Sequence, residues 1–299
     1  MKKEEFQKLI TDQVFYMDGA TGTNLYAAGM PHGICVEGWL LEHPQVLASL
    51  QKDYVENGSM MVYAPTFGAN RNSLRNYDMD GNVADLNKRL VEISQKAVGG
   101  KALVAGDMAP TGMMLECCGG EDSEDEVFEV YREQASVLAE CGVDLIGVET
   151  MMSLAETQIA VDAINSVCDK PIICSMTVAA GERTLYGDRV SEAASLLEDA
   201  GVCAFGVNCS KGPDKLSDVI AAIRLAADLP IIAKPNAGLP QTDGKGGSFY
   251  SMSAEEFARH MLGLHQAGAS LLGGCCGTTP AFIRETKRVI SGDVKLVRR

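Results

Sequence analysis

The chain has 299 residues, of which 46% are hydrophobic, and it carries a formal net charge of −14. This acidic balance excludes a surface that follows nucleic-acid phosphates, and no apolar run is long enough for a membrane-spanning helix. The N-terminus lacks the apolar segment of a secretory signal, so we expect a cytoplasmic protein whose ten cysteines are reduced.

Short apolar segments alternate with segments of helical periodicity along the whole chain. The apolar segments are typical of strands buried on both faces of a parallel sheet. They predict strands at 14–18, 60–64, 102–106, 143–148, 171–177, 202–207, 230–234 and 269–273. The predicted helices are 44–57, 83–97, 125–141, 153–167, 190–200, 213–227, 254–267 and 280–290. This order predicts an α/β fold, a (β/α)8 TIM barrel that forms a single domain over residues 1–299.

A repeated glycine marks the entry to every second predicted strand. Each of these glycines follows a helix, where we expect it to adopt the left-handed conformation that reverses the chain. They are Gly58, Gly142, Gly201 and Gly268. The residues seven and eight positions later are Pro65 and Thr66, Glu149 and Thr150, Asn208 and Cys209, and Cys275 and Cys276. All of them fall at the C-terminal ends of strands, where barrels build their active sites.

Cys209 and the adjacent pair Cys275–Cys276 are therefore expected to meet at the open end of the barrel. Three thiolates on one face can bind zinc and leave its fourth position open for a substrate. A rival pair, Cys117–Cys118, follows the third strand within a loop, where its position is poorly fixed. Spacing favours Cys275–Cys276 over this pair without excluding either.

Two carboxylates are also predicted at this end of the barrel. Asp18 ends the first strand and precedes the glycine-rich turn Gly19-Ala20-Thr21-Gly22, and Glu149 ends the fourth strand. Carboxylates can bind an ammonium group, and the N–H groups of such a turn can bind a carboxylate, so together they suit an α-amino acid. The alternatives are an ordinary tight turn and, for Glu149, a structural ion pair.

These motifs together resemble the homocysteine S-methyltransferase family, and in particular the homocysteine-binding barrel of cobalamin-dependent methionine synthase. The matching motifs are Met17-Asp18-Gly19-Ala20-Thr21-Gly22-Thr23, Thr66-Phe67-Gly68-Ala69-Asn70, Gly106-Asp107-Met108-Ala109-Pro110-Thr111-Gly112, Glu149-Thr150-Met151, Gly206-Val207-Asn208-Cys209-Ser210, Lys234-Pro235-Asn236-Ala237-Gly238-Leu239-Pro240 and Gly273-Gly274-Cys275-Cys276-Gly277-Thr278-Thr279-Pro280. The chain departs from the family pattern at Ala64-Pro65 and in the loop that carries Cys117–Cys118.

The resemblance implies a zinc barrel that methylates homocysteine to methionine. It assigns one zinc ion (Zn2+) per chain to Cys209, Cys275 and Cys276, and this choice excludes the rival cysteine pair. It also implies that Asp18 and Glu149 hold the amino group of homocysteine, and that the backbone at Gly19 and Ala20 holds its carboxylate.

The segment from Pro235 to Pro240 resembles the cobalamin-dependent branch, which implies a methylcorrinoid donor carried by a separate protein or module. The alternatives are a small donor such as S-methylmethionine or a betaine, transfer to another thiol, and a non-catalytic homocysteine-binding subunit. Methionine synthase continues into further modules, so a chain that ends at Arg299 is expected to be an excised module or a free-standing enzyme.

Asn236 follows the seventh predicted strand and is expected at the same end of the barrel as the three cysteines. Zinc with three sulfur ligands needs a fourth ligand when no substrate is bound. We predict that the amide oxygen of Asn236 fills this position and leaves when a thiolate arrives. The alternative is that Asn236 only caps the turn that follows it.

Overall fold

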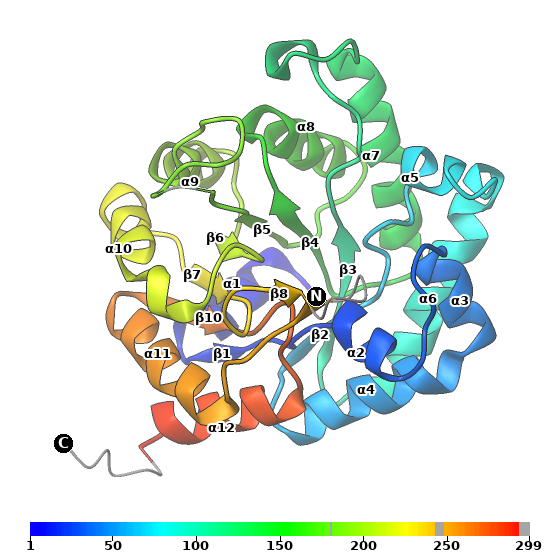
Figure 1. Cartoon of the computed structure of the whole chain (residues 1–299). Helices are drawn as coiled ribbons and strands as arrows, with labels where there is room; N and C mark the ends of the chain where they lie inside the picture. The colour runs from blue at the N-terminus through cyan, green and yellow to red at the C-terminus, as the bar shows by residue number, and fades with distance from the viewer. Residues whose placement is uncertain (180, 243–247, 293–299) are drawn as a thin grey trace.

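Eight parallel strands occupy the centre of the computed structural model, which describes residues 1–179, 181–242 and 248–292 (Figure 1). The strands are β1 (Phe15–Tyr16), β2 (Met61–Tyr63), β3 (Leu103–Met108), β4 (Leu145–Met151), β5 (Ile172–Met176), β6 (Ala204–Asn208), β7 (Ile231–Lys234) and β10 (Ala269–Leu272). Their order is β1-β10-β7-β6-β5-β4-β3-β2. The Met60 N–H donates to the Tyr16 carbonyl (2.7 Å), which links the two ends of the sheet and closes the predicted barrel.

Helices surround the strands, as Figure 1 shows. All eight predicted helices are present, as α4 (Pro44–Glu56), α6 (Val83–Val98), α7 (Glu124–Glu140), α8 (Leu154–Asn165), α9 (Val190–Asp199), α10 (Ser217–Ala226), α11 (Ala254–Gln266) and α12 (Pro280–Ile290). The prediction that the sixth helix begins at Pro213 is wrong. Pro213–Lys215 forms a separate 3-10 turn, and α10 starts only after Leu216, whose φ of −116° interrupts the helical backbone.

Several short elements were not predicted from the sequence. They are α1 (Lys3–Thr11), α2 (Gly22–Ala27), α3 (Val36–Glu42), α5 (Arg71–Arg75) and a hairpin of β8 (Gln241–Thr242) and β9 (Ser248–Phe249). Helix α1 has a structural role, because Phe6 and Ile10 are buried against residues at the N-terminal ends of the strands, including Phe15 and Leu145. It therefore closes the end of the barrel opposite the predicted site.

The repeated glycines adopt the predicted left-handed conformation. Their φ angles are +106° for Gly58, +75° for Gly142, +78° for Gly201 and +121° for Gly268. A side chain would strain the backbone at each position, so glycine fixes where these helices end and the next strands begin. Within the described residues, no helix combines the length and apolar character needed to cross a bilayer.

Candidate active site

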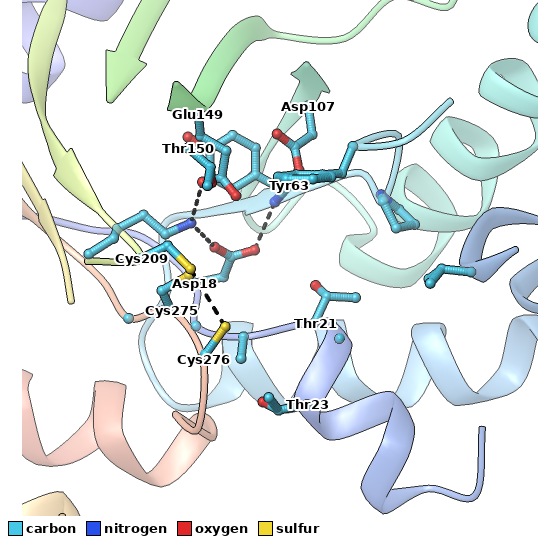
Figure 2. Close-up of a pocket in the computed structure, with 18 of the residues that line it drawn as sticks. Asp18, Thr21, Thr23, Tyr63, Asp107, Glu149, Thr150, Cys209, Cys275 and Cys276 are labelled. Atoms are coloured by element: carbon cyan, nitrogen blue, oxygen red, sulfur yellow. Dashed lines mark hydrogen bonds and ion pairs between the residues drawn. The ribbon is translucent and has the colours of Figure 1, made fainter. Parts of the chain in front are cut away.

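A cavity of about 260 Å³ opens at the C-terminal ends of the strands. Asp18, Glu149 and the three predicted cysteine ligands line it, together with Lys234 and Asp107. Figure 2 shows the sulfur atoms gathered on one side, with Glu149 and Asp107 on the other. Its volume lies somewhat below the roughly 300–1,000 Å³ of pockets for drug-sized ligands, so it suits a small molecule.

The three cysteines Cys209, Cys275 and Cys276 form the one cluster of metal-ligand type found among the described residues. Their sulfur atoms all lie within 4.8 Å of one another, and Sγ of Cys209 is 3.7 Å from Sγ of Cys276. Tetrahedral zinc with bonds of about 2.3 Å to sulfur places its sulfur ligands about 3.8 Å apart. The spacing of these sulfurs therefore fits a zinc ion with three thiolate ligands.

The backbone holds the cysteines in place from neighbouring strands. The Cys209 N–H donates to the Lys234 carbonyl (3.3 Å), and the Cys275 N–H donates to the Pro235 carbonyl (2.8 Å). Cys209 has φ +48°, a left-handed conformation that a non-glycine residue rarely adopts. Such strain persists where the surrounding structure enforces it, and it clusters at functional sites.

Hydrogen bonding divides the protons unequally among the three sulfurs. Hydrogen bonds from Cys209 and Cys275 lower the pKa of Cys276, which favours the thiolate at this sulfur. Hydrogen bonds to Cys209 and Cys276 raise the pKa of Cys275 well above its usual value. A metal ion that replaces the shared protons would bind three thiolates that already lie close together.

The rival pair Cys117–Cys118 lies outside this cluster. It belongs to a 3-10 turn at Glu116–Cys118, and Cys117 is exposed. Its two sulfurs are 3.9 Å apart, and the Cys118 sulfur lies 3.5 Å from the Ser153 hydroxyl. Neither cysteine lines the cavity.

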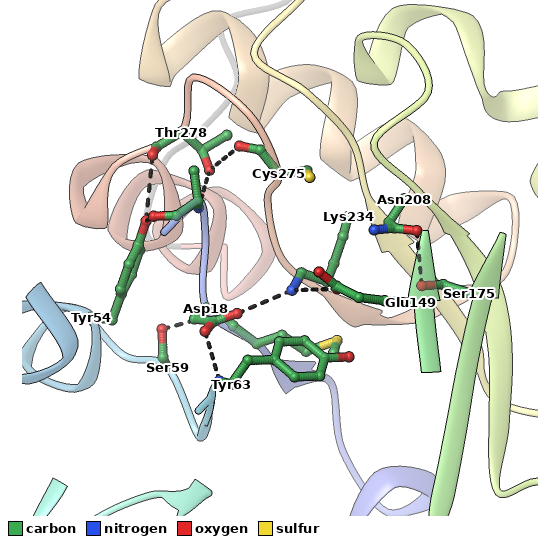
Figure 3. A network of polar contacts seen from close by, with 12 residues as sticks. Asp18, Tyr54, Ser59, Tyr63, Glu149, Ser175, Asn208, Lys234, Cys275 and Thr278 are labelled. Carbon is green, nitrogen blue, oxygen red and sulfur yellow. Dashed lines mark hydrogen bonds and ion pairs between the residues drawn. The ribbon is translucent and has the colours of Figure 1, made fainter. Parts of the chain in front are cut away.

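Asp18 and Glu149 share a partner that the sequence did not indicate. The ammonium group of Lys234 lies 3.1 Å from Oδ1 of Asp18 and 3.3 Å from Oε2 of Glu149 (Figure 3). It also lies 4.0 Å from the centre of the Tyr63 ring. The Tyr63 N–H donates to Oδ2 of Asp18 (2.8 Å). The structural ion pair considered as an alternative for Glu149 is therefore present, and Asp18 takes part in it too.

Lys234 is charged although it is buried. Burial alone would lower the pKa of Lys234, but the Asp18 and Glu149 carboxylates outweigh it and raise that pKa above its usual range. Burial raises the pKa of Asp18 and of Glu149, and Lys234 opposes the rise in both. The ammonium is thus the group that favours the ionised form of both carboxylates at this depth.

Asn208 joins the tips of β4 and β6. Its Oδ1 accepts the Thr150 N–H (2.9 Å), and its Nδ2 donates to the Thr150 hydroxyl (2.8 Å). These bonds hold Thr150 at φ +63°, a genuine outlier for a β-branched residue. The neighbours of these two residues, Glu149 and Cys209, both line the cavity.

The turn after Asp18 packs tightly against the segment that follows the cysteine pair. The Ala20 N–H donates to the Thr278 hydroxyl (3.1 Å), so this N–H, one of those expected to hold a carboxylate, already has a partner. A Cβ atom at Gly19 would lie 2.6 Å from both the Thr278 hydroxyl and the Tyr54 hydroxyl. Only glycine fits there, which explains how the turn comes this close to the cysteines.

Asn236 lies in a loop that is bonded to the cysteine pair. The Ala237 N–H donates to the Cys276 carbonyl (2.9 Å), and the Cys275 N–H donates to the carbonyl of Pro235. The Asn236 side chain is buried, and its Oδ1 has no hydrogen-bond partner among the described residues. An orphaned amide oxygen in this loop has the chemistry of a fourth metal ligand, although Asn236 does not line the cavity itself.

Asp107 and Lys234 were missed as site residues, whereas the glycine repeat placed Asn208 at this end of the barrel without assigning it a role. Asp107 and Lys234 stand at the C-terminal ends of β3 and β7, in the same position as Asp18 after β1. The repeat of capping glycines covered only the alternate strands that end near Glu149, Cys209 and the cysteine pair. Charged residues at the tips of the remaining strands were the available signal.

Known proteins resemble this chain over most of its length. Residues 15–290 match the family model described as homocysteine S-methyltransferase. The methionine synthase of Mycobacterium tuberculosis is 31% identical over 301 aligned positions, which cover 95% of this chain and 25% of that protein. The chain therefore spans about a quarter of the length of this relative.

Solved structures support the fold. The homocysteine methyltransferase MmuM from Escherichia coli superposes in its metallated form with a TM-score of 0.80 and 24% identity, over 94% of this chain and 98% of that one. Its oxidised form also gives a TM-score of 0.80, with 23% identity, over 95% and 99% of the two chains. The carboxyl transferase domain of Rhizobium etli pyruvate carboxylase shares the architecture at a TM-score of 0.55.

Proposed function

We propose that this chain, which belongs to the homocysteine S-methyltransferase family, is a zinc enzyme. It would transfer a methyl group to the thiol of homocysteine to give methionine. One observation carries the proposal: three sulfurs with the spacing of zinc ligands share a small cavity with a cluster of buried carboxylates. A zinc ion held by the three sulfurs suits a thiol, and the carboxylates suit the ammonium group of an amino acid.

Cys209, Cys275 and Cys276 would hold the metal, and Asn236 would complete its coordination in the absence of substrate. Zinc bound there supplies the acidity that turns the acceptor thiol into a nucleophilic thiolate at neutral pH. Asp18 and Glu149 supply the negative charge that holds the ammonium group. The turn at Gly19 and Ala20 binds the carboxylate through its N–H groups, with the Ala20 N–H exchanging its bond to Thr278 for one to the substrate.

We assign the methyl donor to a methylcorrinoid carried by a separate protein or module. Large hydrophobic side chains are exposed on segments that follow the C-terminal ends of strands, the end where the cavity opens: Tyr26, Phe67, Met114, Leu185, Tyr186, Leu239 and Phe249. Exposed apolar side chains in such a position suit a protein that docks over the cavity to deliver a large cofactor.

A small donor bound directly in the cavity is the second candidate. One experiment separates the two: the zinc-loaded chain is incubated with homocysteine and, in turn, methylcobalamin, S-methylmethionine and betaine, and methionine is measured. Methionine formed from methylcobalamin supports the proposal, and methionine formed only from a small donor reassigns the donor. A chain that binds homocysteine but forms methionine with none of them is a non-catalytic subunit.

A further inference from the structure

The carboxylate cluster holds a third acid, and this acid has room for a further partner. Both oxygens of Asp18 are engaged, because Oδ1 pairs with Lys234 and Oδ2 accepts the Tyr63 N–H. Glu149 gives one of its oxygens, Oε2, to the same lysine. When a substrate ammonium group enters this cluster, both oxygens of Asp18 already have partners, and one oxygen of Glu149 has one.

Asp107 is the third acid. It is only 5% exposed, it lines the cavity, and its Oδ1 has no hydrogen-bond partner among the described residues. Its backbone is fixed, since its N–H donates to the Thr66 hydroxyl (2.9 Å) and that hydroxyl donates to the Asp107 carbonyl (2.9 Å). The position is thus rigid while the carboxylate remains unpaired.

The charges around Asp107 leave room for a second cation. Glu149, Asp18 and Glu37 act on it as like charges, and Lys234 is the opposite charge that acts on it. Burial, and then the Glu149 carboxylate, raise the pKa of Asp107 well above its usual range. A buried carboxylate with an unpaired oxygen is costly unless a cation or a proton joins it, and an entering ammonium group would meet this need.

We propose that Asp107 receives the ammonium group of the acceptor and thereby selects an amino-acid thiol over a thiol without an amino group. This assignment rests on the proposed function and deepens it. Asp107 makes the direct contact together with the free oxygen of Glu149. Asp18 contributes through Lys234, which it holds in place. Figure 2 shows Asp107 and Glu149 on the side of the cavity that faces the cysteines, so one small molecule can bridge the two groups.

The test compares homocysteine with 4-mercaptobutyrate, which has the same thiol and carboxylate but no amino group. Isothermal titration of the zinc-loaded protein gives both affinities for the wild type and for Asp107→Asn, which keeps the shape of the side chain. We expect the variant to bind homocysteine roughly ten- to a hundred-fold more weakly, the loss expected for one charge-assisted contact. Its affinity for 4-mercaptobutyrate and its zinc content should stay unchanged.

Glu37→Gln is the matched control. Glu37 is a buried acid that lines the same cavity, but its Oε1 already accepts the Gly68 N–H (2.8 Å). Its replacement should alter the two affinities by the same factor.

Four outcomes overturn the assignment. An Asp107→Asn variant with unchanged homocysteine affinity, or with equal losses for both thiols, removes the ammonium contact while thiol methylation stands. A wild-type protein that binds both thiols equally well removes the selectivity in the same way. A wild-type protein that binds neither thiol overturns the proposed function as well.

Discussion

The sulfur atoms of Cys209 and Cys276 lie 3.7 Å apart although 67 positions separate them in the chain. This distance leads to the first prediction, that the protein binds one zinc ion and that Cys276→Ala largely abolishes binding. Two sulfurs without the third form an incomplete site for a metal that prefers four ligands. Elemental analysis after dialysis measures the zinc content, and full occupancy in the variant would show that the ligand set is wrong.

Cys117→Ser provides the control for this experiment. Cys117 is an exposed thiol beside another cysteine, so it matches Cys276 in chemistry while lying outside the cavity. We expect the Cys117→Ser protein to bind as much zinc as the wild type and to keep its methyl-transfer activity. A loss of zinc here would mean that the rival pair, and not the barrel cluster, takes part in metal binding.

The second prediction concerns the carboxylates that hold the acceptor. Glu149→Gln removes a charge-assisted contact to the buried ammonium, which contributes about 1.5–3 kcal/mol, and Asp18→Asn removes the charge that holds Lys234 in place, so each should weaken homocysteine binding. The dissociation constant, measured by calorimetry with zinc-loaded protein, should rise roughly ten- to a hundred-fold. The zinc content should stay at one ion per chain. Unchanged affinity in both variants would remove these residues from the amino-acid site.

The third prediction is that Lys234→Met destabilises the protein. The variant leaves Asp18 and Glu149 buried without their cation, and breaking such a buried ion pair typically costs about 3–5 kcal/mol. Denaturation by urea at neutral pH measures the loss. Lys215→Met, which replaces a lysine whose side chain is 66% exposed, should have no comparable effect. Equal stabilities of the Lys234 and Lys215 variants would show that the buried ion pair does not support the fold.

The pH dependence of this loss has a definite sign. The folded-state pKa of Lys234 is raised, so its contribution is fully present below the unfolded value of about 10.4 and disappears as pH rises through the folded value. In the variant, the pKa values of Asp18 and Glu149 rise further, and the folded state takes up protons that the unfolded chain binds only near pH 4. The difference in stability between the wild type and the Lys234→Met variant should therefore shrink as the pH falls from 7 to 5. A deficit that grows over this range would contradict this explanation.

The barrel and the cysteine cluster could be predicted because local signals define them. Gly201 and Gly268 end helices in the left-handed conformation, and a fixed count from each reaches the tip of the following strand. Continuous apolar runs identified the strands between the helices. The elements that were missed give weaker local signals. The strands β8 and β9 have two residues each, too few to show alternation, and α1 is a short helix that is polar except for the face carrying Phe6 and Ile10.

The charge network could not be predicted because it depends on contacts between distant parts of the chain. Lys234 ends an apolar strand, where a lysine usually reaches the surface, and its partner Asp18 lies 216 positions away. The burial of the lysine follows only from the closed sheet, which places the tips of β1, β4 and β7 around one cavity. For the same reason, the sequence did not show that the Ala20 N–H would be bonded to Thr278.

The most direct test of the central claim is X-ray absorption at the zinc edge before and after homocysteine is added. We predict three sulfur ligands and one oxygen in the free protein, with the oxygen at about 2.0–2.2 Å, and four sulfur ligands in the complex. Asn236→Ala should lose the protein-derived oxygen yet still reach four sulfurs with homocysteine. An unchanged set of three sulfurs after homocysteine is added, in protein that has bound the ligand, would contradict the claim that this barrel activates the thiol on its metal.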